Sequence, residues 1–432
     1  MKNKWSLAAV TLLLCACFLI FPGCALKDLL ISGWPMPEEQ EYHGEEAAAP
    51  DPGLGASYQT EEAGLPAAGE GLRDEGMPPA ISGMAVTSGN SSGKDEELMD
   101  FPESCYAYSV LSERRKKIYV EIYRCLCDRS EEVLLSTKDP DEADLVFNAV
   151  MIDHPEIFYV SGYRITKTTL AGRITAIDFT GRYIMSDWEI AENRKKIEEY
   201  VNRFLEGVPD TEDEFEKVKY IFDYLVDHTE FKEGSDNNQN VCSVFVNGRS
   251  VCQGYSMAAK YLADEIGVFA TVAYGFAHGN GHAWNIFRIN GVYCHVDVTW
   301  GDSSYQNAYS GSAESFTDYA YLGADDDLIR TQHETAYFIR MPVCDSLEQY
   351  YFVKTGRYFE EPDRLKLMDL FREAYAGGEE ILTIRCADFD VYDELSDDLF
   401  EEKEIFQYLK GDGKARYVRN REELTISFLL SV

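Results

Sequence analysis

The chain has 432 residues, enough for roughly two or three domains, and its hydrophobic content of 45% is sufficient for packed cores. It carries 76 acidic residues against 40 basic ones, which gives a net charge of −36. This charge argues against nucleic acid as a partner and against an electrostatic hold on anionic lipid.

The N-terminus has the pattern of an export signal over residues 1–24. Lys2 and Lys4 precede an apolar run from Leu7 to Phe21, and the run is followed by a small residue and Cys24. The end of the run resembles a bacterial lipobox, although Phe21 and the following proline depart from the usual pattern. The resemblance implies a lipid on Cys24, with ordinary signal cleavage or an uncleaved anchor as alternatives. We expect the protein at the outer face of the cytoplasmic membrane or the cell surface, lipid-anchored.

Residues 25–100 have the composition of a flexible segment. They contain 16 acidic and 3 basic residues, 7 of the 14 prolines and 11 of the 32 glycines. Such a segment buries too little apolar surface to offset the entropy lost on ordering. We predict a disordered acidic tether that holds the folded part away from the membrane.

Residues 101–187 have mixed helix and strand patterns. Apolar residues recur at helical spacing over Tyr108–Cys127, a second helix is predicted over Glu142–Met151, and strands are predicted at Ile157–Val160 and Ile174–Phe179. These elements predict a small α/β lead-in domain. A histidine before proline at a helix end is usually a cap or turn residue, so we do not include His154 among the catalytic candidates.

Three helices are predicted next. The first covers Trp188–Leu205, and the second follows a capping box formed by Thr211 and Glu214. The third is an Ala- and Leu-rich stretch that Gly267 ends, and it begins at or near Cys252. Unpaired N–H groups and the positive end of a helix dipole stabilise a thiolate, the nucleophilic form of cysteine.

A β-hairpin follows, because Asn290 and Gly291 form the strongest short-range turn signal. A two-residue loop pairs Ile289 with Val292 and makes Asp297 the diagonal neighbour of His282, about 7–8 Å away between backbones and within side-chain reach. That side of the ribbon is polar, whereas the opposite side is mostly apolar and should be buried. A histidine beside a carboxylate suits a general base and the group that orients it.

These segments resemble the transglutaminase-like superfamily, whose core is the papain-like thiol fold. The pattern G-x-x-V-C-x-G-Y is matched at 248–255, G-x-x-H-A-W-N at 279–285 and H-V-D-V-T-W at 295–300. The resemblance implies Cys252 as nucleophile, His282 as base and acid, and Asp297 as the residue that orients the imidazole. It also implies an α+β core, with the helix that carries the cysteine packed on an antiparallel sheet, over residues 188–345.

Other residues compete for roles in the site. His278 is followed by glycine and is predicted in a turn, and His295 shares the polar side of the ribbon but lies nearer the hairpin end. The register of the hairpin and the resemblance both favour His282. The sequence leaves four candidates for the oxyanion donor: the backbone amide of Cys252 and the side chains of Asn247, Gln253 and Asn285.

Metal sites and disulfides have little support. The cysteines and histidines around the hairpin lack zinc-finger spacing, and the run 325–327 lacks the spacing of a calcium loop, so it is predicted to be a solvated turn. We therefore predict neither a metal nor a cofactor. The cysteines beyond the signal are scattered, and most are expected to be buried free thiols, with one or two disulfides possible.

Residues 346–432 show helical patterns at Asp363–Ala376 and Leu395–Leu409 between strands, which predicts a C-terminal α/β module without a catalytic signature. The whole chain is expected to be a thiol acyltransferase or hydrolase acting on glutamine or other amides of proteins or peptides, with lysine amines as one acceptor. The alternatives are a peptidase or amidase of the same fold acting on cell-wall or surface peptides, and a non-catalytic surface adhesin or scaffold.

Overall fold

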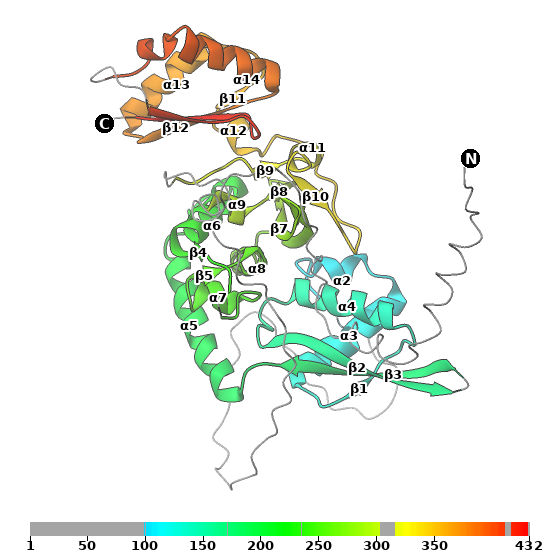
Figure 1. Ribbon diagram of the computed structural model, residues 1–432. Helices are drawn as coiled ribbons and strands as arrows, with labels where there is room; N and C mark the ends of the chain where they lie inside the picture. Colours follow the sequence, from blue (N-terminus) through cyan, green and yellow to red (C-terminus); the bar gives the residue numbers. More distant parts are fainter. Residues whose placement is uncertain are drawn as a thin grey trace, which may run out of the picture. The chain divides into compact units, whose positions relative to one another are not determined.

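The computed structural model describes residues 99, 101–170, 172–234, 236–302, 316–410 and 416–430. The predicted export signal over 1–24 with Cys24 and the predicted tether over 25–100 lie outside the described residues, apart from Met99. Within the described ranges, no helix is both long and apolar enough to cross a membrane. The described residues combine helices with mainly antiparallel sheets, which confirms the α+β class (Figure 1).

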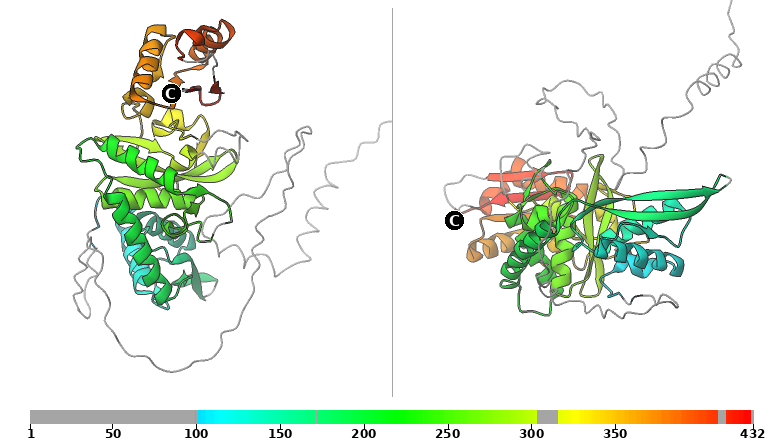
Figure 2. Two further views of the ribbon diagram at one scale, coloured as in Figure 1. Left: turned by 90° about the vertical axis from the view of Figure 1, so that its left-hand side faces the viewer. Right: turned by 90° about the horizontal axis from the view of Figure 1, so that it is seen from below.

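The first segment pairs three helices with a three-stranded sheet in the order β1-β3-β2. Strands β2 and β3 form the long hairpin that is visible in Figure 2. The elements are α2 (Tyr106–Val110), α3 (Glu113–Asp128), β1 (Val133–Leu134), α4 (Pro140–Asp153), β2 (Val160–Leu170) and β3 (Arg173–Tyr183).

Two local predictions for this segment were wrong. The helix predicted over Tyr108–Cys127 is two helices, because the chain becomes extended at Leu111 and Ser112. Of the strand predicted over Ile157–Val160, only Val160 belongs to a strand, β2; before it lies a turn in which Ile157 donates its N–H to the carbonyl of His154, the residue after α4. The apolar side chains of the turn are buried there without belonging to a strand.

The next helices support the helix that carries Cys252. They are α5 (Asp187–Leu205), α6 (Glu214–His228), α7 (Val241–Phe245) and α8 (Cys252–Glu265), with a short parallel pair formed by β4 (Glu230–Phe231) and β5 (Arg249–Ser250). The predicted capping box before α6 was wrong: Asp213 caps the helix by accepting from the N–H of Phe215, and Glu214 instead accepts from the N–H of Asn290. The predicted helix beginning at Cys252 is confirmed, and Gly267 follows its end with φ of 71°.

A five-stranded antiparallel sheet in the order β10-β6-β7-β8-β9 lies against α8 (Figure 1). Its strands are β6 (Ala270–Ala277), β7 (Asn280–Ile289), β8 (Val292–Val296), β9 (Leu322–Ala324) and β10 (His333–Thr335), and the short helices α9 (Val298–Gly301) and α11 (Asp326–Ile329) flank β9 in sequence. The predicted hairpin is confirmed: Ile289 pairs with Val292, and the turn residues Asn290 and Gly291 both have positive φ.

Both faces of this sheet are buried, and the face with His282 and His295 also carries the apolar Trp284 and Ile286. The apolar face, which includes Ala283, Phe287 and Cys294, belongs to the large hydrophobic cluster that also contains buried residues of α8. The face that carries Trp284 forms a second cluster with Trp300 and other residues beyond the hairpin. The site below therefore lies in a largely buried setting.

The C-terminal segment has a separate hydrophobic cluster around a four-stranded sheet in the order β11-β12-β14-β13. The predicted helix over Leu395–Leu409 was wrong, because Asp388 caps a helix that begins at Phe389 and Lys403 adopts a left-handed conformation. The elements are α12 (Tyr351–Lys354), β11 (Tyr358–Phe359), α13 (Arg364–Gly377), β12 (Ile381–Cys386), α14 (Phe389–Ser396), a π-helical turn (Asp397–Glu401), a 3₁₀ turn (Glu404–Gln407), β13 (Arg416–Asn420) and β14 (Thr425–Leu429).

Candidate active site

Cys252 is the first residue of α8, and no side chain caps the helix start. Among the eight described cysteines, all of which are free thiols, six are buried, whereas Cys252 is half-buried. Gly254 allows this helix start to pack closely, because a Cβ there would lie 2.0 Å from Ser250 Oγ and 2.5 Å from Ser243 Oγ. The thiol is thus accessible at a helix N-terminus, where backbone N–H groups stabilise negative charge.

His282 lies on β7, opposite Gly275 of β6. Its Nε2 donates to Oδ2 of Asp297 at 2.6 Å, and the side chain of Cys252 is near enough to affect the pKa of the imidazole. Burial alone would lower the pKa of His282, but the charge of Asp297, the hydrogen bond that His282 donates to it and the interaction with Cys252 raise the pKa to about 10. The imidazole is therefore protonated at neutral pH, between a thiol and a carboxylate.

Asp297 follows β8 and caps α9. Its Oδ1 accepts from the backbone N–H of Trp300 at 3.1 Å, and its own N–H donates to the carbonyl of Tyr321. Burial would raise the pKa of Asp297, but the charge of His282 and hydrogen bonds from two imidazoles hold it well below its usual range. The carboxylate is therefore ionised and fixed at both oxygens.

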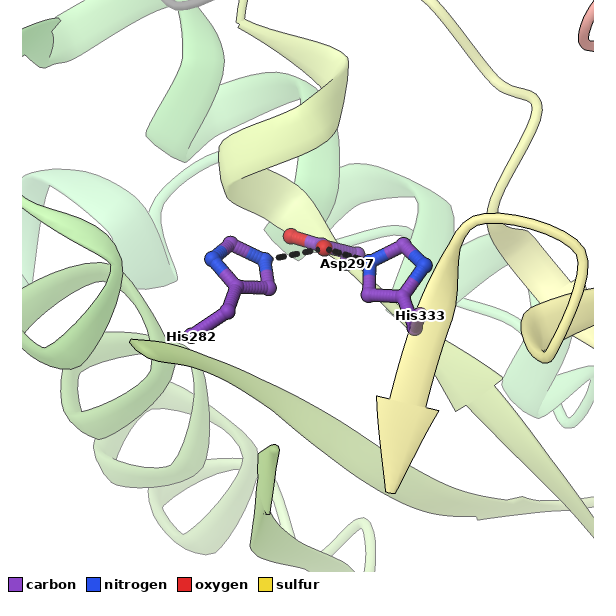
Figure 3. Close-up of side chains that lie close together, drawn as sticks. All are labelled: His282, Asp297 and His333. Carbon is purple, nitrogen blue, oxygen red and sulfur yellow. Dashed lines mark hydrogen bonds and ion pairs between the residues drawn. The ribbon is translucent and has the colours of Figure 1, made fainter. Parts of the chain in front are cut away.

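The second imidazole belongs to His333, which the sequence analysis missed. His333 is on β10, and its Nε2 donates to the same Oδ2 of Asp297 at 2.9 Å (Figure 3). Burial lowers the pKa of His333 in spite of this bond, so the ring is neutral. No motif surrounds His333 in the sequence, and only the pairing of β10 with β6 brings it to the site.

His295, the competing histidine of the ribbon, has different partners. Its Nδ1 accepts from the indole N–H of Trp284 at 3.0 Å, and its Nε2 lies 3.0 Å from Oδ1 of Asp326. Burial lowers its pKa although the bond to Asp326 opposes the shift. Asp326 is therefore engaged with His295 rather than part of a solvated turn. Among the described residues, His295 makes no hydrogen bond or ion pair with Cys252 or Asp297. His278 lies in a turn, as predicted, and stacks on Trp300 at 5.0 Å between ring centroids.

The structure narrows the choice of oxyanion donor. The side chain of Asn285 is buried and donates to the carbonyls of Ser256 and Thr271, so it connects α8 to strand β6 of the sheet. Asn247 donates to the carbonyl of Asp236. Gln253, next to Cys252, donates to the hydroxyl of Tyr274 at 2.9 Å. These bonds engage the side-chain amides of all three candidates, whereas no side chain caps the start of α8 at Cys252.

Two clusters have the donor atoms of a metal site. One is His282, Asp297 and His333, and the other consists of His295, Asp326 and Cys344; in each cluster the ligand atoms lie within 4.8 Å of one another. In the second cluster Trp284 already donates to Nδ1 of His295, so a metal on Nε2 would leave the ring without a proton. In the first cluster both Nε2 atoms donate protons to Asp297. The hydrogen bonds thus account for both clusters without a metal.

One family model matches part of the chain. The model of the Transglutaminase-like superfamily matches residues 199–298, which include Cys252, His282 and Asp297. A search of curated proteins finds no match.

Solved structures also show likeness. A TGase crystal structure is 16% identical over 32% of this chain and 44% of its own, with a TM-score of 0.24. A candidate cysteine protease from Cytophaga hutchinsonii is 13% identical over 32% of this chain and 61% of its own, with a TM-score of 0.22. Menin is 16% identical over 52% of this chain and 51% of its own, with a TM-score of 0.22.

The chain thus spans about half the length of these structures, and TM-scores this low support no argument about activity. The family match over residues 199–298 supports a thiol acyltransferase or protease-like function in general terms. On the strength of that match, the chain contains a domain of the transglutaminase-like superfamily.

Proposed function

We propose that the protein is a thiol acyltransferase or hydrolase in which Cys252 is the nucleophile, His282 the acid and base, and Asp297 the residue that orients His282. The observation that carries the proposal is the position of His282, which donates to the Asp297 carboxylate at 2.6 Å and has its pKa raised by the neighbouring Cys252 side chain. This order of thiol, imidazole and carboxylate is the arrangement that nucleophilic catalysis by cysteine requires.

The chemistry follows from the charges. The His282 imidazolium stabilises a thiolate on Cys252, which attacks the carbonyl carbon of a carboxamide or peptide bond. His282 then gives its proton to the departing nitrogen, so that ammonia or an amine leaves and a thioester remains on Cys252. A lysine amine or water attacks the thioester, His282 takes the proton of the attacking group, and the thiolate departs with a new amide or an acid as product.

The proposed setting is the outer face of the cell. The apolar run from Leu7 to Phe21 has the pattern of an export signal, and Cys24 follows it where a lipid would be attached. The net charge of −36 argues that the proposed substrates are proteins or peptides rather than nucleic acid. An acidic leash would let the domain reach substrates near the membrane.

Mass spectrometry of products tests the proposal. The full chain, purified in detergent, is incubated with a library of glutamine-containing peptides and a primary amine. Acyl transfer releases ammonia and couples the amine to glutamine, hydrolysis releases ammonia and leaves glutamate, and proteolysis creates new termini. Cys252→Ala is expected to lose every product, and Cys127→Ala, which removes another free thiol, is the matched control. A non-catalytic scaffold would yield no product with the unaltered chain.

A further inference from the structure

We propose that His333 is a positioning residue that acts through Asp297: it takes part of the negative charge of the carboxylate and so sets how strongly Asp297 holds the His282 imidazolium. The inference rests on the proposed function, because it assigns a role in the same reaction. Its basis is that one oxygen, Oδ2 of Asp297, accepts from His282 at 2.6 Å and from His333 at 2.9 Å (Figure 3).

Strand order explains how the two imidazoles meet. β6 lies between β10 and β7, and Gly275 of β6 pairs with His282 on one side and with Thr335 on the other. A Cβ at Gly275 would lie 2.0 Å from the carbonyl oxygen of Glu334, so only glycine lets β10 approach this closely. The close approach places His333 within reach of the carboxylate at the end of β8.

The protons of His333 can be assigned from its partners. An ionised carboxylate only accepts hydrogen bonds, so the Nε2 atom of His333 carries the proton that Asp297 receives. Nδ1 of His333 has no hydrogen-bond partner among the described residues, although it is buried. A neutral ring with the proton on Nε2 fits this setting, since a second imidazolium beside His282 and near His295 would be repelled.

Aromatic rings fix the orientation of the His333 side chain. Trp300, Tyr321 and Trp284 surround it, with centroids 4.8, 4.9 and 5.2 Å from that of the imidazole. His333 is 3% exposed, so water does not compete for its Nε2–H. The bond to Asp297 is therefore preorganised and is not made at the expense of ordering a mobile side chain.

The shared oxygen has a chemical consequence. Each donor withdraws charge from the carboxylate, so a bond from the neutral His333 weakens the pull of Asp297 on the His282 proton. A less tightly held proton is transferred more readily to the departing nitrogen. Loss of His333 should strengthen the hold on the imidazolium, while Trp300 still anchors the other oxygen of Asp297.

The test compares two substitutions at His333 with one control. His333→Phe keeps an aromatic ring but removes the donor, and His333→Gln restores a donor where Nε2 lies. His154→Phe is the matched control, because His154 is also buried, at 2% exposed, and lies outside the site at the end of α4. The readouts on the full chain are ¹⁵N imidazole spectra through a pH titration, kcat and KM against pH, and the unfolding midpoint.

We expect His333→Phe to move the alkaline limb of kcat/KM and the His282 titration up by on the order of one pH unit. Its kcat should fall about tenfold with little change in KM, and His333→Gln should lie near the unaltered protein. A role confined to packing would lower the unfolding midpoint without an upward shift of the limb, and that result overturns the inference. A His333 ring protonated on Nδ1 in the unaltered protein also overturns it.

The spectra separate this inference from the proposed function. If the unaltered chain shows no turnover that depends on Cys252, the proposed function fails. The inference about His333 is then still tested by two spectroscopic results: the tautomer of His333 and the shift of the His282 titration in His333→Phe. If His333→Phe does not fold, the inference is tested by the pH profile of His333→Gln and by the His333 tautomer in the spectra of the unaltered chain.

Discussion

Trp284 donates its indole N–H to Nδ1 of His295 across 3.0 Å, and this bond fixes the proton of His295 on the nitrogen that faces Asp326. Two histidines of the sheet therefore pair with an aspartate: His295 with the half-buried Asp326 of α11, and His282 with the buried Asp297. The second pair also contacts Cys252. The two pairs provide an internal comparison for mutagenesis.

The first prediction uses this comparison. Asp297→Asn should reduce kcat by roughly 100-fold or more, because an amide cannot hold the imidazolium in the correct proton state. Asp326→Asn should leave kcat within about threefold of the unaltered protein, since its partner has no contact with the thiol. Steady-state kinetics with an amide substrate gives both values, and equal losses in the two variants would count against the assignment of the site.

The second prediction concerns the reactivity of the thiol. Iodoacetamide at pH 6–7 should label Cys252 faster than Cys127, because the imidazolium of His282 stabilises a neighbouring thiolate, whereas burial of its thiol raises the pKa of Cys127 to about 12. His282→Ala should slow labelling of Cys252 and leave that of Cys127 unchanged. Peptide mapping after timed quenching measures both rates in one sample. Slower labelling of Cys252 in the unaltered protein would contradict the ion pair.

The third prediction concerns stability against pH. The folded state raises the pKa of His282 from 6.5 to about 10, so its ion pair stabilises the protein fully below pH 6.5 and is lost as pH rises to about 10. The free energy of unfolding should fall by at most about 1.4 kcal/mol per pH unit over this window for one proton. Urea unfolding of His282→Gln should lack this decline, whereas the exposed His228→Gln should retain it. A parallel decline in both variants would exclude His282 as its source.

The fourth prediction concerns the contact of the C-terminal segment with the site. Trp300 donates its indole N–H to Oε1 of Glu423 at 2.5 Å, and Oε2 of Glu423 has no donor among the described residues. Burial, followed by the charge of Asp318, raises the pKa of Glu423 well above its usual value. A proton on Glu423, shared with Asp318, satisfies both carboxyl groups.

Because the folded carboxyl keeps its proton to higher pH than the unfolded one, stability falls as pH rises above about 4.5. Glu423→Gln keeps an acceptor for Trp300 and a donor for Asp318. The variant should therefore lack the decline in the free energy of unfolding, which is up to about 1.4 kcal/mol per pH unit in the unaltered protein. The exposed Glu422→Gln is the control. Unfolding measured between pH 5 and 8 checks the prediction, which is wrong if Glu423→Gln is the less stable variant at pH 8.

Local patterns in the sequence determined much of the site. The helix α8 from Cys252 was predicted from an Ala- and Leu-rich stretch that Gly267 ends. The pairing of Ile289 with Val292 was predicted from the turn at Asn290 and Gly291. The hairpin register alone places the side chains of His282 and Asp297 within reach. Local patterns erred where tertiary packing chose among similar options, as in the buried turn after His154 and the cap of α6 at Asp213.

Only the tertiary structure decided which other groups surround the site. His333 reaches Asp297 across 36 positions through β10, and Glu423 reaches Trp300 across 123 positions. The indole of Trp284 occupies one ring nitrogen of His295, whereas His282 hydrogen-bonds Asp297. Such contacts leave no periodic or turn signal in the sequence, because each joins segments whose adjacency arises only when the sheet and its surroundings assemble.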